Sequence, residues 1–206
     1  MRAAALTESR DDTPRARPDP DASLMAQVRE GNRDAYRHLY EKHYAAIVRY
    51  ATGFTGNRAR AEELAQDVFL QVYRARERWE PRARFTTWLY RIAHNTCLNE
   101  VRRFDYRGRV GPLEGPEGEP LELEDAGAVG GDETVSLHEF EDRLRALVAE
   151  LPETQRTALL LSRVQDMRYE EIGSVLGCTE QAVKSLIFRA TRRLREGLRE
   201  WIPEEP

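Results

Sequence analysis

The chain has 206 residues, of which 33% are charged and 40% are hydrophobic, and its formal net charge is −4. No apolar run approaches the roughly 20 residues that a membrane-spanning helix needs, and the N-terminus lacks the apolar core of a signal peptide. The two cysteines, Cys97 and Cys178, make neither a disulfide framework nor a metal-binding quartet. We therefore expect reduced, mostly packing cysteines in a cytoplasmic protein.

The charges are segregated along the chain. Residues 23–109 carry 17 Lys and Arg against 10 Asp and Glu, whereas residues 110–142 carry 11 acids and no base. Residues 143–199 are basic again, with 11 bases against 7 acids. Of the 32 basic residues 30 are Arg, whose guanidinium suits phosphate and base contacts. A GC-rich genome would also enrich Arg, but it would not separate two basic blocks by an acidic one.

The first basic block is predicted to form one helical domain over residues 23–106. Residues 1–22 hold three prolines and dense charge with few large apolar groups, which predicts a disordered tail. From Leu24 onward, apolar side chains recur at three- and four-residue steps, the period of an amphipathic helix. Gly31 and Gly56 separate successive helices, and no strand-like alternation occurs.

The acidic stretch is predicted to be a linker over residues 107–136, because it is rich in Gly, Pro and acids and has little to bury. Helical periodicity resumes over residues 137–200, where Pro152 suits the first turn of a helix, and residues 201–206 form a short tail. The fold class that we expect is all-α, with two small helical domains joined by a flexible acidic linker.

The last sixty residues contain the layout of a helix-turn-helix. A short helix over 169–176 is followed by a turn at Gly177, a favourable N-cap at Thr179 and a longer helix. Helical spacing places six side chains on the outward face of that second helix: Gln181, Lys184, Ser185, Phe188, Arg189 and Arg192. Such a face fits the DNA major groove. An ordinary solvated basic helix would look similar, but it would rarely place Phe188 among exposed cations.

Residues 79–109 combine aromatic and basic side chains. The aromatics are Trp79, Phe85, Trp88, Tyr90, Phe104 and Tyr106, and arginines lie between them. Aromatic rings stack on unpaired bases while cations follow the backbone, which is the chemistry of single-strand binding. We expect Trp88 and Leu89 to be core instead, because of their helical spacing. A polar face remains at helical spacing and consists of Arg91, Asn95, Asn99 and Arg102.

Three sequence blocks occur together in a specific order: AEELAQDVFLQVYR, FTTWLYRIAHNTCLNEVRR, and LPETQRTALLLSRV followed by YEEIGSVLGCTEQAVKSLIFRA. In these blocks the chain resembles the extracytoplasmic-function (group 4) sigma factors of the sigma-70 family, which are promoter-recognition subunits of bacterial RNA polymerase. The resemblance covers residues 24–105 and 137–199. It implies a region 2-like bundle, a region 4-like helix-turn-helix, and a linker where larger sigma factors carry a third domain. Asn99 departs from the Asp of many relatives.

The resemblance implies three binding surfaces. Core RNA polymerase, through its β and β′ subunits, would bind Gln66, Asp67, Leu70 and Arg74. The melted −10 element would bind Trp79, Arg84, Phe85, Arg91, Asn95, Asn99, Arg102 and Arg103, with the loop 81–85 accepting a flipped nucleotide. The −35 element would be read by Gln181, Lys184, Ser185, Phe188, Arg189 and Arg192. The resemblance also implies an anti-sigma factor as a regulatory partner, the bacterial cytoplasm as the location, and no cofactor.

Two other classes of function explain the sequence less well. A two-component-type regulator would share the helix-turn-helix, but residues 24–105 lack the alternating strands of a phosphate-receiving domain. An enzyme such as a nuclease would need a carboxylate or histidine cluster, whereas the four histidines (His38, His43, His94 and His138) are scattered. His94 and Cys97 alone cannot complete a four-ligand zinc site. We therefore expect a DNA-binding factor with no catalytic residue, metal, small-molecule substrate or membrane insertion.

Overall fold

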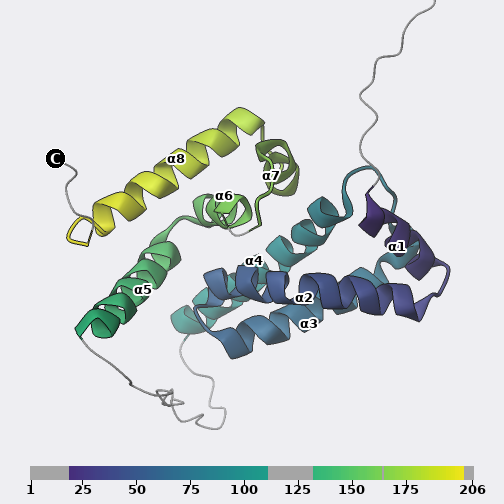
Figure 1. The fold of residues 1–206 in the computed structure, drawn as a ribbon, viewed down its shortest axis with the longest axis horizontal. Coiled ribbons are helices and arrows are strands. Elements are labelled where there is room, and N and C mark those ends of the chain that lie inside the picture. Colours follow the sequence, from purple (N-terminus) through teal and green to yellow (C-terminus); the bar gives the residue numbers. More distant parts are fainter. Residues whose placement is uncertain (1–18, 111–131, 164, 202–206) are drawn as a thin grey trace, which may run out of the picture.

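The computed structural model describes residues 19–110, 132–163 and 165–201, and every regular element in that part of the chain is a helix (Figure 1). The N-terminal domain consists of α1 (Pro20–Arg29), α2 (Arg33–Thr55), α3 (Arg58–Arg74), the short 3₁₀-helix η1 (Arg76–Arg78) and α4 (Phe85–Val110). The C-terminal domain consists of α5 (Asp132–Glu150), α6 (Glu153–Arg163), α7 (Tyr169–Leu176) and α8 (Glu180–Gly197). The all-α prediction is confirmed.

Helix starts in the N-terminal domain follow from short polar side chains. The side-chain oxygen of Asn32 accepts hydrogen bonds from the backbone N–H groups of Asp34 and Ala35 at the start of α2. Asn57 accepts from the N–H of Arg60 in the same way. Gly56 adopts a φ of +64° between these two helices, a conformation that costs glycine little. These caps explain why α2 ends and α3 begins within three residues.

The core of the N-terminal domain lies between α2, α3 and α4. Its largest fully buried side chains include Tyr50, Phe69 and Phe85. Helix α1 is attached to this core by two acids. The Asp19 carboxylate accepts a hydrogen bond from the Phe85 backbone N–H at 2.7 Å, and the buried Asp21 contacts His43 and Lys42 of α2 at 2.9 and 2.6 Å.

Three predicted boundaries differ from the helix ends. Helix α1 begins at Pro20, inside the predicted tail 1–22, because Asp19 caps it and the polar Asp21 is buried in an ion pair. Helix α4 continues to Val110 and α5 begins at Asp132, so both helices extend into the predicted linker 107–136. Most of that linker, the first 18 residues and residues 202–206 lie outside the described part of the chain.

The predicted helix-turn-helix is confirmed in its geometry. Gly177 has a φ of +67° and ends α7, and the Thr179 hydroxyl accepts from the Ala182 N–H to begin α8. A Cβ on Gly173 would lie 2.6 Å from the Cys178 carbonyl oxygen, so the close approach of α7 to the turn requires glycine there. Helix α8 packs against α6 and α7, and its Val183, Ile187 and Ala190 are buried.

The two domains pack against each other, which the sequence interpretation of two tethered units did not anticipate. Helix α7 lies against α4, and α6 lies against α2. Buried side chains of both domains, such as Tyr50 and Leu161, belong to one continuous hydrophobic cluster. At Gly53 of α2, an added Cβ would lie only 2.6 Å from a methyl group of Leu160 in α6, so the glycine permits this close approach.

Candidate nucleic-acid interface

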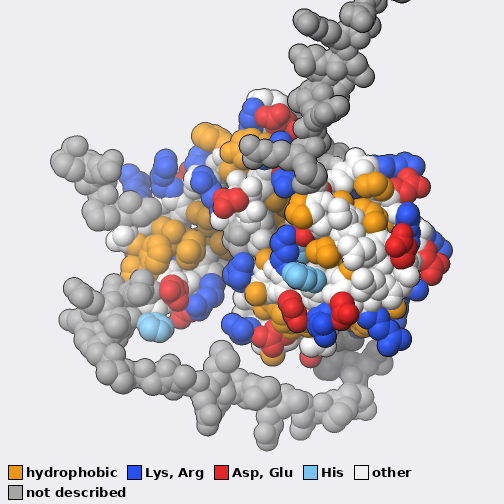
Figure 2. Space-filling model, turned by 45° about the vertical axis from the view of Figure 1, so that its right-hand side comes forward, with side chains coloured by type: hydrophobic (Ala, Val, Ile, Leu, Met, Phe, Trp, Pro, Cys, Tyr) orange, Lys and Arg blue, Asp and Glu red, His pale blue; other side chains and the backbone are white. Residues whose placement is uncertain are grey.

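The face of α8 that points away from α6 and α7 is exposed to solvent. Phe188 is 66% exposed, and the side chains of Lys184, Arg189 and Arg192 around it are exposed as well. Figure 2 shows Lys and Arg side chains gathered along the edge that α8 forms, above a patch of hydrophobic side chains between α5 and α8. A large aromatic ring among cations gains nothing from packing within this chain, so its environment suits a partner's surface.

The cations of α8 have local partners that a phosphate could replace. The Lys184 ammonium lies 2.7 Å from Glu180, and this hydrogen bond raises the pKa of the lysine. Arg192 lies 3.5 Å from Glu196, and the Ser185 hydroxyl donates to the Gln181 carbonyl. All of these contacts join residues four apart on one solvated helix and hold the side chains only weakly. The six residues predicted on this face are therefore brought together, with Ser185 half-buried and the others exposed.

On the polar face of α4, the two asparagines face solvent, whereas the arginines have partners within the protein. Asn95 and Asn99 are exposed. The Arg91 guanidinium instead donates to the backbone carbonyl of Ser174 in α7 at 2.6 Å, and Arg84, in the loop just before α4, lies 3.3 Å from Glu171. The other two predicted arginines also pair with acids, because Arg102 lies 3.8 Å from Glu153 of α6 and Arg103 lies 3.7 Å from Glu100.

Two aromatic side chains predicted to stack on bases are core residues. Trp79 is 3% exposed and Phe85 is fully buried, so neither ring presents a face to solvent in this structure. The Phe85 ring packs against His43 of α2 and Trp88 of α4, and η1, which directly precedes Trp79, contacts α1 and α3. Of the two residues expected to be core, Leu89 is fully buried and Trp88 is half-buried.

A depression of about 360 Å³ lies beside the loop 81–84, where a flipped nucleotide was expected. The residues that line it are Arg78, Glu80, Arg82, Ala83, Thr87, Trp88 and Arg91. The Thr87 hydroxyl is buried there and, among the residues that the structure describes, has no hydrogen-bond partner. Three of these residues, Arg78, Arg82 and Thr87, are not predicted from the sequence. Their only signal was proximity to the aromatic and basic segment.

The predicted polymerase-binding residues share one face of α3. Gln66, Asp67, Leu70 and Arg74 are all exposed, and Leu70 is half exposed although it is apolar. Tyr73, which the sequence analysis did not single out, is exposed beside them, and the Arg76 guanidinium lies over its ring at 4.2 Å. Val68, Phe69 and Val72 on the opposite face are buried, as their spacing predicts.

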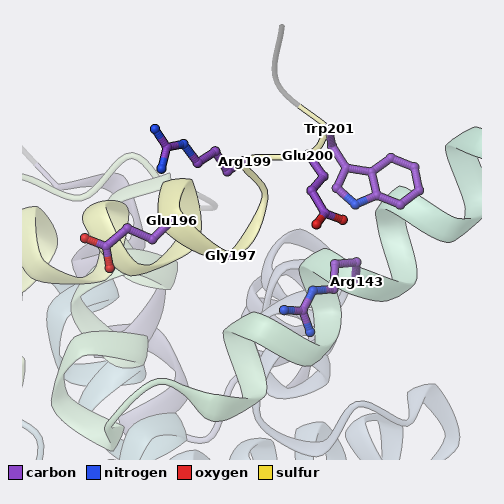
Figure 3. A pocket seen from close by; sticks show the side chains of 6 residues that line it. All are labelled: Arg143, Glu196, Gly197, Arg199, Glu200 and Trp201. Atoms are coloured by element: carbon purple, nitrogen blue, oxygen red, sulfur yellow. The ribbon is translucent and has the colours of Figure 1, made fainter. Parts of the chain in front are cut away.

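A second depression, of about 670 Å³, lies between α5 and the end of α8. Figure 3 shows its lining, in which the Glu200 carboxylate points toward α5, where Arg143 lies, and the Trp201 ring lies beside that helix. Trp201 also packs edge-on against Phe140 of α5. Charged and apolar groups of this kind in a wide, open hollow suit a protein surface better than an enclosed small molecule.

The thiols and the remaining acids do not gather into a reactive site in the described ranges. Cys97 and Cys178 are free, and burial raises the pKa of the Cys97 thiol to about 12. Within residues 19–110, 132–163 and 165–201, no three His, Cys, Asp or Glu side chains are placed to share a metal ion. Over the same ranges, none of the helices combines the length and apolarity of a bilayer span.

Two family models match the chain, and they fall on the two domains. The model described as sigma-70 region 2 matches residues 39–105, and the model described as sigma-70, region 4 matches residues 141–194. The match to region 2 covers most of α2, all of α3 and most of α4, and the match to region 4 covers α6, α7 and most of α8.

Curated proteins and solved structures resemble the chain over nearly its whole length. The RNA polymerase sigma-H factor of Pseudomonas aeruginosa is 30% identical over 90% of this chain and 97% of its own. The ECF RNA polymerase sigma factor SigW of Bacillus subtilis is 29% identical over 85% and 95%. In structure, CnrH in complex with the cytosolic domain of CnrY matches with a TM-score of 0.65 at 24% identity over 88% of this chain and 99% of that one. The sigma factor RpoE of Bartonella quintana, solved with the anti-sigma factor NepR, matches with a TM-score of 0.59 at 21% identity over 80% and 96%.

Proposed function

Because the chain belongs to the extracytoplasmic-function group of the sigma-70 family, whose members direct promoter-specific initiation by RNA polymerase, we propose how its own surfaces divide that work. The N-terminal domain binds core polymerase through α3 and the melted −10 element through α4. The C-terminal domain binds the −35 element through α8. The domain limits proposed from the sequence, 23–106 and 137–200, each contain one of these DNA-binding helices.

The observation that carries this proposal is the exposed Phe188 within the row of cations on α8. The second helix of a helix-turn-helix enters the major groove, where its early residues meet base edges. Lys184 and Ser185 then face bases, Phe188 contacts a thymine methyl or the sugar backbone, and Arg192 contacts phosphate. Gln181 and Arg189 flank them on the same face.

The test is to combine the chain with core RNA polymerase on fragmented genomic DNA and to sequence the transcripts. We expect initiation at a limited set of start sites that share a −10 and a −35 element. Phe188→Ala should reduce transcription from those sites about tenfold or more without unfolding the protein, since the ring is exposed. Transcription that is equally frequent with and without the chain would contradict the proposal.

On α4, we propose that Asn95 and Asn99 contact unpaired bases, because their amides are exposed and carry both donors and acceptors. The adjacent depression with Thr87 and Trp88 accepts one unstacked base, and Arg82 at its rim meets the backbone. Arg84, Arg91, Arg102 and Arg103 supply further phosphate contacts. Trp79 and Phe85 act from the core by holding the start of α4 in place.

On α3, we propose that Leu70 and Tyr73 form the apolar part of the polymerase contact and that Gln66, Asp67 and Arg74 surround it. Asp67→Arg reverses a charge on this face without disturbing the buried side. We expect it to weaken retention by immobilised core polymerase about tenfold or more. The control is Glu41→Arg, an exposed position of α2 outside this face, which should be retained as well as wild type. Equal retention of Asp67→Arg and wild type would remove this face from the contact.

We also propose control by an anti-sigma factor, as for RpoE, which was solved in complex with NepR. A partner that covers the apolar Leu70 and Tyr73 would keep the chain from polymerase. If so, the tagged chain isolated from its own cells carries a protein that core polymerase displaces, and the Asp67→Arg variant releases it less readily to polymerase. A partner that remains bound together with polymerase would contradict this mode of control.

Sigma factors are non-enzymatic initiation factors, and we propose that this chain likewise catalyses no reaction, uses no cofactor and acts in the bacterial cytoplasm. Polymerase supplies the chemistry of RNA synthesis, and the chain supplies binding and position. In the transcription assay above, the chain should be required only for the choice of start site. Elongation from a preformed RNA–DNA scaffold should proceed at the same rate without it.

A further inference from the structure

We propose that Asp19 is a positioning residue for binding of the melted −10 element. Its carboxylate joins the first turn of α1 to the first turn of α4 and so fixes the depression beside the loop 81–84. The inference rests on the proposed role of that depression in accepting an unstacked base. It gives α1, which has no part in the proposed polymerase, −10 or −35 contacts, a part in promoter recognition.

The two carboxylate oxygens of Asp19 have different partners. Oδ1 accepts a hydrogen bond from the Asp21 backbone N–H at 3.1 Å, and this contact caps the start of α1. Oδ2 accepts from the Phe85 backbone N–H at 2.7 Å, 66 positions further along the chain. One side chain therefore caps two helices, which it can do because a carboxylate carries two acceptor oxygens.

Helix α4 begins without a capping side chain at the residue before it. That residue is Arg84, whose guanidinium has donors but no acceptor, and the first turn of α4 contains no acid. The first N–H groups of a helix have no partner within it, and the positive end of the helix dipole lies there. Asp19 supplies the acceptor and the negative charge from a different helix.

Asp19 is held in place because α1 is attached to α2. Two residues further along α1, the buried Asp21 carboxylate contacts Lys42 at 2.6 Å and His43 at 2.9 Å. The His43 ring in turn packs against the Phe85 ring, with the ring centroids 5.6 Å apart. The start of α4 is thus fixed twice, through the Phe85 ring from α2 and through the Phe85 N–H from α1.

The residues that this contact holds belong to the proposed base site. Thr87 and Trp88, in the same first turn of α4, line the depression of about 360 Å³. Asp19 and Thr87 also line a second depression, of about 560 Å³, on the loop 81–84. The loop is exposed and belongs to no helix, so its geometry depends on where α4 begins. Loss of the Asp19 contact frays that turn and displaces the Thr87 hydroxyl and the Trp88 ring.

Three substitutions of Asp19 separate this role from the capping of α1. Asn and Ser cap helices about as well as Asp, but each offers one acceptor oxygen where the carboxylate offers two. Asp19→Asn and Asp19→Ser should therefore leave α1 intact and release α4, whereas Asp19→Ala should lose both contacts.

Hydrogen exchange read by mass spectrometry tests the contact itself. Exchange over residues 85–89 should quicken about fivefold or more in all three variants, and over residues 20–29 only in Asp19→Ala. Wild-type exchange over residues 85–89 in every variant would overturn the proposal.

The functional readout is initiation by core polymerase with each variant on a promoter found by transcript sequencing. The −10 segment of the non-template strand is left unpaired, and one base at a time is removed to leave an abasic site. For wild type, removal of the base that enters the depression should slow initiation about tenfold or more. In Asp19→Asn and Asp19→Ser this penalty should fall to about threefold or less, because the displaced site no longer uses the base. Loss of a carboxylate near DNA would by itself favour binding.

Glu30→Gln, which removes an exposed carboxylate at the other end of α1, is the matched control and should keep the wild-type penalty. Equal penalties in wild type and the Asp19 variants would overturn the positioning role and leave the proposed function intact. An equal slowing on every template would show that Asp19 is merely structural and would also overturn it. If wild type shows no position-specific penalty, the proposed base site is wrong and the inference fails with it.

Discussion

The two helices proposed to bind DNA, α4 and α8, both carry cationic and polar side chains, but these side chains differ in what they contact. On α8, Phe188 is exposed, and the ion pairs of Lys184 and Arg192 in the described structure join residues of the same helix. On α4 and the loop before it, Arg84, Arg91 and Arg102 contact residues of the other domain, whereas Asn95 and Asn99 are exposed to solvent.

The difference shows that a basic face in sequence does not determine whether that face is available. Isolated i, i+4 pairs such as those on α8 are weak and exchange readily with a phosphate. The arginines of α4 must instead leave acceptors that are anchored to a second domain through a buried seam. Availability on α4 is thus a property of tertiary packing.

The largest difference is expected between two phenylalanines. Phe85→Ala should lower the free energy of unfolding by about 3–5 kcal/mol, because the ring is fully buried at the start of α4. Phe188→Ala should change it by no more than about 0.5 kcal/mol, because the ring is 66% exposed. Urea denaturation followed by circular dichroism measures both. Comparable losses of stability would mean that Phe188 packs within the chain and is not a DNA contact.

A second prediction divides base reading from phosphate binding along α8. Lys184→Ala should alter which −35 sequences are used, with a base-specific loss of roughly 5- to 100-fold. Arg192→Ala should weaken all promoters alike and make the salt dependence of binding shallower by about one unit. A randomised −35 library transcribed by each variant with core polymerase compares them. Identical promoter profiles for the two variants would show that α8 lies differently in the groove.

The smallest predicted effect is a loosening of the domain seam on acidification. Burial, and then the nearby charge of Arg102, lowers the pKa of His94 below its ordinary value of 6.5. The closed form therefore favours neutral His94, and its advantage is fully present above pH 6.5 and declines as the pH falls toward the lowered pKa. One proton limits the effect to at most tenfold in the open-to-closed ratio per pH unit.

Scattering measured between pH 7.5 and 5.5 should show the radius of gyration rising at the acid end for wild type and not for His94→Gln. Glu171 does not contribute in this window, because its pKa lies below its ordinary 4.5. His43, whose pKa burial also lowers, lies within the N-terminal domain and is present in both proteins. An equal pH response in the His94→Gln variant would remove His94 from the seam.

Much of the fold follows from local patterns. The caps at Asn32, Asn57 and Thr179 and the left-handed glycines at 56 and 177 set helix limits that periodicity and turn residues already indicate. On α8, the exposed face could be predicted because it depends on the periodicity of one helix. Val183, Ile187 and Ala190 face inward, so the residues between them face outward.

The part that sequence could not supply depends on contacts between distant residues. Trp79 and Phe85 look like base-stacking aromatics in a basic segment, yet both are buried, Phe85 against His43 of α2. The seam is formed by pairs such as Gly53 with Leu160, over 100 positions apart in the chain. Neither residue carries a motif, and glycine in a helix reads only as a weak helix former. Tyr73 on α3 follows the same apolar spacing as its buried neighbours in the sequence, and only the structure shows that its side chain is exposed.

The most direct test is the distance between the two domains, measured in the free protein and again with polymerase and promoter. Spin labels on Ala45→Cys and Thr154→Cys, both exposed and outside the proposed contacts, in a Cys178→Ser background report this distance by pulsed dipolar spectroscopy. We expect one short distance for the free chain and a shift of tens of ångströms when core polymerase and promoter DNA are added. A distance that is the same in both samples would contradict the separation of α4 from α8 on which promoter recognition is proposed to depend.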